Sequence, residues 1–128
     1  MAKVVWKNDP EDHDYPAAAA YLSLIAPPET VTLLVDRLRA TETIHQKAKD
    51  LLRASGLPLL DTDNPHVASD MRKIRKGREL SPVLLVRGDL DSGRPLQIAD
   101  GYHRVCASYH VDENTDIPCR VATTAPPQ

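Results

Sequence analysis

The segment from Asp100 to Arg104 combines a glycine with polar side chains that suit an anion. Gly101 allows a tight backbone conformation and a close approach of phosphate, which a Cβ atom would hinder. Arg104 offers a rigid fork of donors to two phosphate oxygens, and His103 offers one donor whose charge changes near neutral pH. These residue types predict a phosphate site at Gly101, His103 and Arg104. The same spacing also fits a turn glycine followed by two solvated polar residues.

Asp100, directly before this glycine, is the candidate catalytic residue. Its carboxylate could act as a base, hold Mg²⁺ through water, or orient Arg104. It could equally cap the following helix by accepting a hydrogen bond from a backbone amide. The residues by themselves leave these four roles open.

Two strands, a short helix and a third strand are the elements that must position these residues. The apolar runs "SPVLLVRGD" and "LQIADG" flank the turn-rich "LDSGRP" and predict two strands. "YHRVCASYH" predicts the helix, and "DIPCRVA" predicts the last strand. A strand that ends at a glycine and continues as a helix directs unpaired backbone N–H groups beyond the sheet edge, where an anion can bind.

Upstream of these elements, the sequence predicts four helices. The first runs from Pro16 to the prolines at 27 and 28, and the second begins at Pro28 with one apolar face. The third runs from about Thr43 to Gly56, a left-handed stop. In the fourth, Asn64 caps the helix and Pro65 begins it. Their predicted apolar positions are Val31, Leu34, Val35 and Leu38, then Ile44, Ala48, Leu51 and Leu52, then Val67, Met71 and Ile74.

The fourth helix carries the densest basic cluster in the chain. A charge run on a helix is usually a solvated face, and the alternative is contact with a polyanion or a nucleotide phosphate. The cluster consists of Arg72, Lys73, Arg75, Lys76 and Arg78.

Length, composition and charge favour one soluble, cytoplasmic domain without a membrane span. The chain has 128 residues, 41% of them hydrophobic, and a net charge of −2. This charge argues against a surface built for nucleic acid, which usually needs excess Lys and Arg. Cys106 and Cys119 are expected to be reduced and partly buried. The acidic "DHD" at 12–14 is expected to be solvated rather than a metal site.

The segment "DGYHRVCAS", preceded by "LQIA" and followed by "DIPCRVA", resembles the signature of the ParB/sulfiredoxin superfamily. Members have a strand, a Gly-x-His-Arg or Gly-x-Arg-Arg box that opens a helix, and an Ile-Pro strand. The upstream "NPHVASDMRKIRKGRELSPVLLV" is similar to the family's Asn-Pro turn, helix and Pro-initiated strand. The resemblance covers about half of the chain.

This resemblance implies an α+β fold with a ParB/sulfiredoxin-like β-β-α-β unit and three N-terminal accessory helices. The expected organisation is an exposed arm at 1–15, a helical layer at 16–56, the core at 57–122 and a tail at 123–128. Gly101, His103 and Arg104 would bind the phosphates of ATP or CTP, with Mg²⁺ as a further cofactor.

The sequence departs from the family in two ways, and each argues against one of the family's known activities. Tyr102 stands where a sulfiredoxin has its catalytic cysteine, and Cys106 is expected to face inward, which argues against sulfiredoxin chemistry. Few residues follow Ala122, so we expect no helix-turn-helix domain of the chromosome-partition type.

The expected function is nucleotide binding, with phosphotransferase or nucleotide hydrolase activity as the enzymatic form. Asp100, Asp61, Asp63 and Glu79 are the unranked candidates for the activating carboxylate. The alternatives are a catalytically silent module, whose N-terminal helices bind a protein partner or form a homodimer, and a nuclease or nucleic-acid-binding protein.

Overall fold

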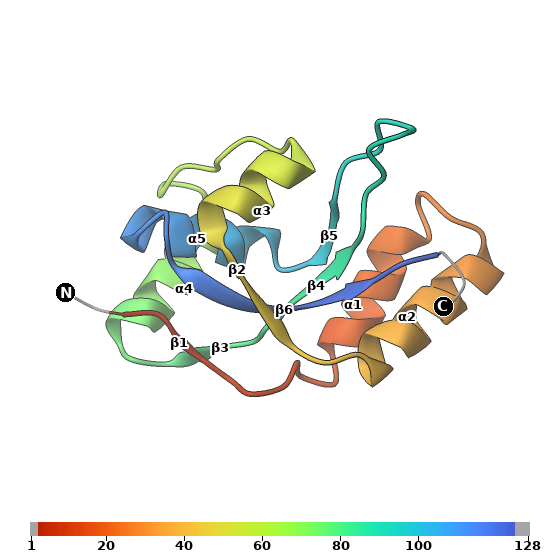
Figure 1. The fold of residues 1–128 in the computed structure, drawn as a ribbon. Helices are drawn as coiled ribbons and strands as arrows, with labels where there is room; N and C mark the ends of the chain where they lie inside the picture. Colours follow the sequence, from red (N-terminus) through yellow and green to blue (C-terminus); the bar gives the residue numbers. More distant parts are fainter. Residues whose placement is uncertain (1–2, 125–128) are drawn as a thin grey trace.

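The computed structural model describes residues 3–124 and shows an α+β protein, as predicted (Figure 1). Residues 125–128 of the predicted tail lie outside the described residues. The helices are α1 (Asp14–Leu22), α2 (Pro28–Ala40), α3 (Ala48–Ser55), α4 (Pro65–Arg75) and α5 (Tyr102–Val111). The strands are β1 (Val5–Trp6), β2 (Ile44–Lys47), β3 (Glu79–Leu80), β4 (Val83–Val86), β5 (Gln97–Asp100) and β6 (Asp116–Ala122).

Four strands form a mixed sheet in the order β2-β6-β4-β5. β4 pairs with β6 in parallel and with β5 in antiparallel fashion, and β2 pairs antiparallel with β6. The predicted strand, strand, helix and strand are thus present as β4, β5, α5 and β6. β5 lies at one edge of this sheet, and the turn that follows its C-terminal residue Asp100 leads into α5 (Figure 1).

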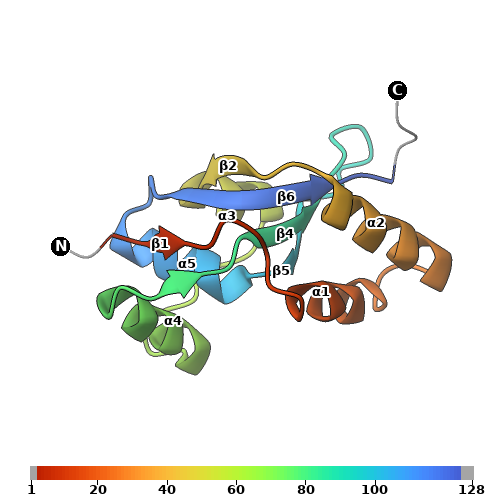
Figure 2. The ribbon, with the colours of Figure 1, turned by 90° about the horizontal axis from the view of Figure 1, so that it is seen from below.

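Helices cover both faces of this sheet and create two hydrophobic cores (Figures 1 and 2). On β4, Val83 and Leu85 join the core formed with α3, α4 and α5, while Leu84 and Val86 join the core formed with α1 and α2. Successive residues of a strand point to opposite faces, so a strand covered on both sides needs a continuous apolar run. This explains "VLLV" in the sequence and its complete burial.

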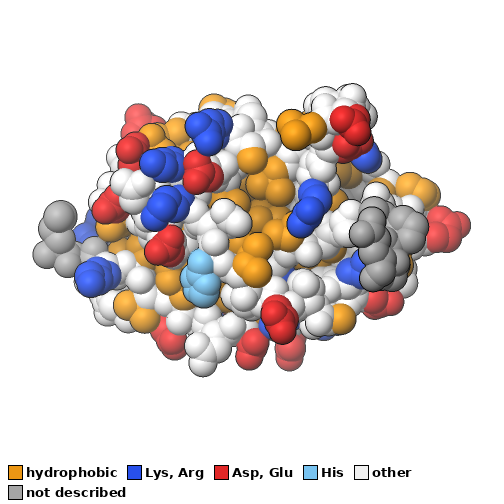
Figure 3. Space-filling model, in the orientation of Figure 1, with side chains coloured by type: hydrophobic (Ala, Val, Ile, Leu, Met, Phe, Trp, Pro, Cys, Tyr) orange, Lys and Arg blue, Asp and Glu red, His pale blue; other side chains and the backbone are white. Residues whose placement is uncertain are grey.

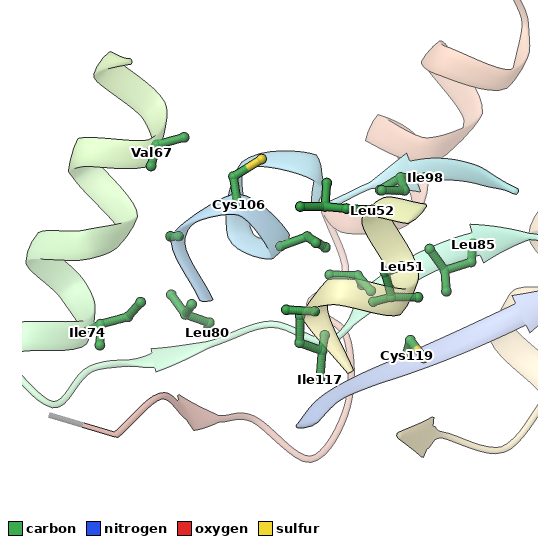
Figure 4. Close-up of a cluster of buried hydrophobic side chains, with 14 residues drawn as sticks. Leu51, Leu52, Val67, Ile74, Leu80, Leu85, Ile98, Cys106, Ile117 and Cys119 are labelled. Carbon is green, nitrogen blue, oxygen red and sulfur yellow. The ribbon is translucent and has the colours of Figure 1, made fainter. Parts of the chain in front are cut away.

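The larger core fixes α4 and α5 against the sheet (Figure 4). Ile74 and Val67 from α4 and Cys106 from α5 are buried there with Ile117 and Cys119 from β6. Both cysteines are free and buried, as expected from the sequence, and burial raises the pKa of Cys119 to about 11. Cys106 is fully buried in this core, and burial raises the pKa of its thiol as well.

The N-terminal segment is not the exposed arm that the sequence suggested. β1 pairs in parallel with β3, and the Lys7 amide donates to the Leu80 carbonyl at 2.8 Å. Asp14 and Tyr15 are 3% and 6% exposed, and α1 begins at Asp14 rather than Pro16 and ends at Leu22. The segment is ordered because it follows the edge of β3 and then places α1 on the sheet.

The predicted helix from Thr43 to Gly56 is wrong in its first part. Residues Ile44–Lys47 form β2, paired with β6, and only Ala48–Ser55 are helical. Ile44 fits the helical period of the apolar positions, but the unpaired edge of β6 supplies backbone partners that a sequence pattern does not reveal. Gly56 ends the helix with φ +68°, as predicted. The helices α2 and α4 begin at Pro28 and Pro65, also as predicted.

The predicted helical layer at 16–56 is divided between the two faces of the sheet, since α1 and α2 contact one core and α3 contacts the other. Within residues 3–124, no helix is both long enough and apolar enough to cross a bilayer.

Candidate functional site

Gly101 forms the turn between β5 and α5 in a conformation that only glycine adopts readily. Its φ is +112°, and a Cβ atom added to it would lie 2.5 Å from Val83 Cγ1 and 2.9 Å from Arg104 Nη2. Side chains rarely tolerate such a φ, and a 2.5 Å contact is a clash. The backbone therefore turns tightly against β4, and α5 begins at the sheet edge without a side-chain cap.

Arg104 lies over this turn and forms an ion pair with Asp100. Its Nη2 donates to Asp100 Oδ2 at 2.9 Å and to the Pro82 carbonyl at 3.3 Å. Its Nε is buried and has no hydrogen-bond partner among the described residues. Of the four roles considered for Asp100, the orientation of Arg104 is the one that this ion pair can perform directly.

A pocket of about 210 Å³ opens between α4 and the start of α5. Its wall combines residues from the β5–α5 turn with one polar stripe of α4. The lining residues are His66, Ser69, Asp70, Lys73, Asp100, Gly101, His103 and Arg104. All four predicted site residues are thus brought together, and α4 adds four more.

Lys73 belongs to the basic cluster for which the sequence left phosphate contact open, whereas His66, Ser69 and Asp70 were missed because their types are ordinary for a solvated helix face. His66, Ser69, Asp70 and Lys73 recur at i, i+3, i+4 and i+7, which is the spacing of one helix face. This polar stripe beside the apolar stripe of Val67 and Ile74 was the signal that could have identified them. Sequence spacing alone does not show that the stripe faces Gly101 rather than solvent.

Two histidines of the pocket lining contact each other. The rings of His66 and His103 lie with centroids 4.7 Å apart, and each histidine is the second residue of its helix. Burial, followed by the neighbouring His66, lowers the pKa of His103. The start of a helix favours negative charge, so an anion between these two helix ends would be attracted by both.

The carboxylates of the pocket are partly withdrawn from water. Burial is the main cause that raises the pKa of Asp70, and Lys73 opposes it. Burial also raises the pKa of Asp100, with Arg104 opposing the rise and Asp14 adding to it. Both shifts disfavour the ionised form of these carboxyls.

Other candidates from the sequence lie elsewhere. Asp61, Asp63 and Glu79 are exposed and do not line the pocket. Of the basic cluster on α4, only Lys73 lines the pocket, while the other four side chains are exposed. The Tyr102 hydroxyl donates to the carbonyl of Pro58, so this side chain holds the loop before α4 against α5.

The acidic N-terminal segment converges more than its sequence suggested. Ligand-type atoms of Glu11, His13 and Asp14 lie within 4.8 Å of one another, and Asp14 is buried rather than solvated. Within this group, Glu11 contacts both Lys7, at 3.1 Å, and His13, at 3.0 Å.

Comparisons with family models, with curated proteins and with solved structures found no match for this chain.

Proposed function

We propose that this protein binds the phosphate groups of a nucleotide in the pocket between α4 and α5. The observation that carries the proposal is the convergence of Arg104, Lys73 and two histidines on a glycine turn where two helices begin. Phosphate recognition in proteins uses this combination of a guanidinium fork, an ammonium group and helix starts. Arg104 lines the pocket, and its buried Nε has no hydrogen-bond partner among the described residues.

The two cations that line the pocket support an anionic ligand. Two permanent cations, Lys73 and Arg104, face two carboxylates whose pKa values are raised by burial. A dianionic phosphate would add favourable pairs with both cations, in a pocket that is too polar for an apolar ligand.

We also propose that the chain is a small, cytoplasmic member of the ParB/sulfiredoxin superfamily. The order β4, β5, α5 and β6, with an Asn-Pro helix start upstream, agrees with the order expected of that family. ATP and CTP, with Mg²⁺, are the nucleotides that this relationship favours.

If phosphoryl transfer or hydrolysis occurs, Asp70 is a better candidate base than the exposed carboxylates proposed from the sequence. Its side chain is 13% exposed, lines the pocket and has a pKa raised by burial, which moves a carboxyl toward the range useful for a base near neutral pH. Asp100 is already engaged by Arg104.

The test is isothermal titration calorimetry with ATP, CTP, GTP and ADP, each with and without Mg²⁺. We expect binding of at least one nucleotide, weakened at least about tenfold by Arg104→Ala, because charged hydrogen bonds are lost. Arg75→Ala is the matched control, since Arg75 belongs to the same basic cluster but lies outside the pocket. Equal losses in both variants would point to general charge attraction and against the pocket.

A second candidate function is protein interaction through the N-terminal helices. Leu24 is 80% exposed and Ile25 56% exposed just after α1, and Leu33 on α2 is 40% exposed. This function would be favoured if none of the four nucleotides binds and sedimentation equilibrium gives the mass of a dimer.

Nucleic-acid binding has less support. On the face shown in Figure 3, Lys and Arg side chains alternate with acidic and hydrophobic ones rather than forming a continuous basic surface. Binding of a labelled duplex at low salt, lost steeply as salt rises, would nevertheless favour this function over the first.

A further inference from the structure

The pocket between α4 and α5 has a lining that suits one part of a nucleotide only. Apart from Gly101, every described residue that lines it is polar or charged. Pockets that enclose a whole organic ligand usually have about 300 to 1,000 Å³ and a mainly apolar and aromatic lining. This pocket has about 210 Å³. Both its size and its lining therefore favour a small, highly charged group over an apolar one.

Each of the two helices contributes one permanent cation to this pocket. On α4, Lys73 Nζ lies 3.8 Å from Asp70 Oδ1, and on α5, Arg104 Nη2 lies 2.9 Å from Asp100 Oδ2. Because α4 packs against α5 (Figure 2), cations from both helices line the same pocket. Phosphate oxygens are the part of a nucleotide that guanidinium and ammonium groups bind.

The aromatic rings at the pocket already contact one another. The ring centroids of His66 and His103 are 4.7 Å apart with planes inclined by 42°, and the Tyr102 ring lies 5.7 Å from that of His103. The Tyr102 hydroxyl donates to the Pro58 carbonyl, which holds this ring in place. A nucleobase that stacked on His103 would therefore compete with ring neighbours from the chain itself.

Cavities with more apolar linings lie elsewhere in the described part of the chain. One of about 460 Å³ is lined by Trp6 and Val111 among others, and one of about 370 Å³ by Leu22 and Val86 among others. Neither shares a lining residue with the pocket between α4 and α5. The apolar surface on which a nucleobase gains affinity therefore forms no part of that pocket.

We infer that the pocket selects its ligand by the phosphate groups alone, so that inorganic oligophosphates such as tripolyphosphate are ligands in their own right. The inference rests on the proposed function, because it assigns the selectivity of the same pocket. Phosphates gain affinity from the cations on both helices, whereas a nucleobase gains affinity from stacking and from apolar contacts. The nucleobase of a bound nucleotide accordingly adds little affinity and is not discriminated.

The test is isothermal titration calorimetry of the full chain with tripolyphosphate, ATP, CTP, GTP and UTP, each with and without Mg²⁺. Tripolyphosphate is the phosphate part of these nucleotides without a nucleoside. A nucleobase that stacked on the protein would raise the affinity by at least about fivefold. We expect none of the nucleotides to bind more than about fivefold tighter than tripolyphosphate, or than one another.

Variants of the lining show whether both kinds of ligand use this pocket. Arg104→Ala should weaken tripolyphosphate and ATP by the same factor, about tenfold or more, because charged hydrogen bonds are lost. Lys73→Ala, whose side chain is 47% exposed, gives the same comparison if Arg104→Ala is unfolded. Lys76→Ala is the matched control, since Lys76 is exposed at the end of α4 and lies outside the pocket. Unchanged tripolyphosphate binding in a folded Arg104→Ala or Lys73→Ala variant overturns the inference.

His66→Asn tests nucleobase stacking directly, because it removes an exposed ring and keeps a polar side chain. We expect the ratio of the ATP and tripolyphosphate affinities to stay the same. A loss confined to ATP would show that His66 stacks on the nucleobase and would overturn the inference.

The outcomes separate this inference from the proposed function. A nucleotide that binds more than about fivefold tighter than tripolyphosphate, or a preference of that size for one nucleobase, overturns the inference and leaves the proposed function intact. Binding of tripolyphosphate without binding of any nucleotide supports the inference and overturns the proposed function. If none of these ligands binds, the proposed function is wrong and the inference falls with it.

Discussion

At the scale of single residues, the site depends on Gly101, which allows a tight turn of the backbone and leaves space for neighbouring side chains. Gly101 turns the chain where β5 ends, and the absence of a Cβ lets Arg104 lie directly over the turn. The sequence suggested a glycine that allows phosphate to approach closely. In the structure the first neighbours of the missing Cβ are Val83 and Arg104, so the glycine is required by packing even without a ligand.

Gly101→Ala should therefore be more destabilising than an alanine at another left-handed glycine. We expect a loss of about 2 to 4 kcal/mol, from the positive φ and the contact with Val83 together. Gly56→Ala, at φ +68° with nothing within 4 Å of the new Cβ, should lose about 1 to 2 kcal/mol. Urea unfolding of both variants measures the difference, and equal losses would show that the Val83 contact relaxes freely.

At the scale of elements, α4 has an apolar face that packs in the core and a polar face that lines the pocket. Its apolar face joins the larger core, and its polar stripe forms one wall of the pocket. The start of this helix is fixed by Asn64, whose Oδ1 accepts the amides of His66 and Val67 at 3.0 and 3.2 Å. The cap thereby sets the position of His66 opposite His103.

Asn64→Ala should lower the free energy of unfolding by about 1 kcal/mol, because two amides at the start of α4 lose their acceptor. Asn64→Ser keeps a capping oxygen and should lose much less. Denaturant unfolding measures both variants. If serine and alanine are equally destabilising, the contribution of Asn64 lies in its backbone conformation and not in its side chain.

The element that sequence reasoning missed most clearly is β2. Ile44, Ala48 and Leu51 follow a helical period, so the pattern favoured one long helix from Thr43. Ile44 is 42% exposed in the structure and contributes little to a core. Its segment is a strand because β6 offers a free edge, and this edge exists only in the folded sheet.

At the scale of the whole molecule, Arg120 on β6 connects the N-terminal half to the sheet. Its side chain is 12% exposed and donates to Tyr15 Oη, to Asp9 Oδ1 and to Thr43 Oγ1. It also donates to the carbonyls of Leu38 and Arg39 at the end of α2. One guanidinium therefore links the N-terminal segment, α1 and α2 to the sheet.

Arg120→Ala should lower the free energy of unfolding by about 2 to 3 kcal/mol, because several partly buried groups lose a charged donor. Arg53→Ala is the control: Arg53 is 85% exposed, and its pair with Asp50 should contribute less than about 1 kcal/mol. Chemical denaturation measures both. Similar small losses in the two variants would show that the α1–α2 layer is held by its apolar contacts alone.

The sequence by itself determined the strand, turn, strand, helix and strand around Gly101, the starts of α2 and α4, and the residues Asp100, Gly101, His103 and Arg104 as one group. These features follow from local rules: period, capping, proline and glycine chemistry, and neighbours in sequence. Tertiary structure decided what faces that group. The α4 stripe of His66, Asp70 and Lys73 lies opposite Gly101, and β2 pairs with β6. Both arrangements join residues far apart in the chain, and a local pattern carries no information about which distant surface it will meet.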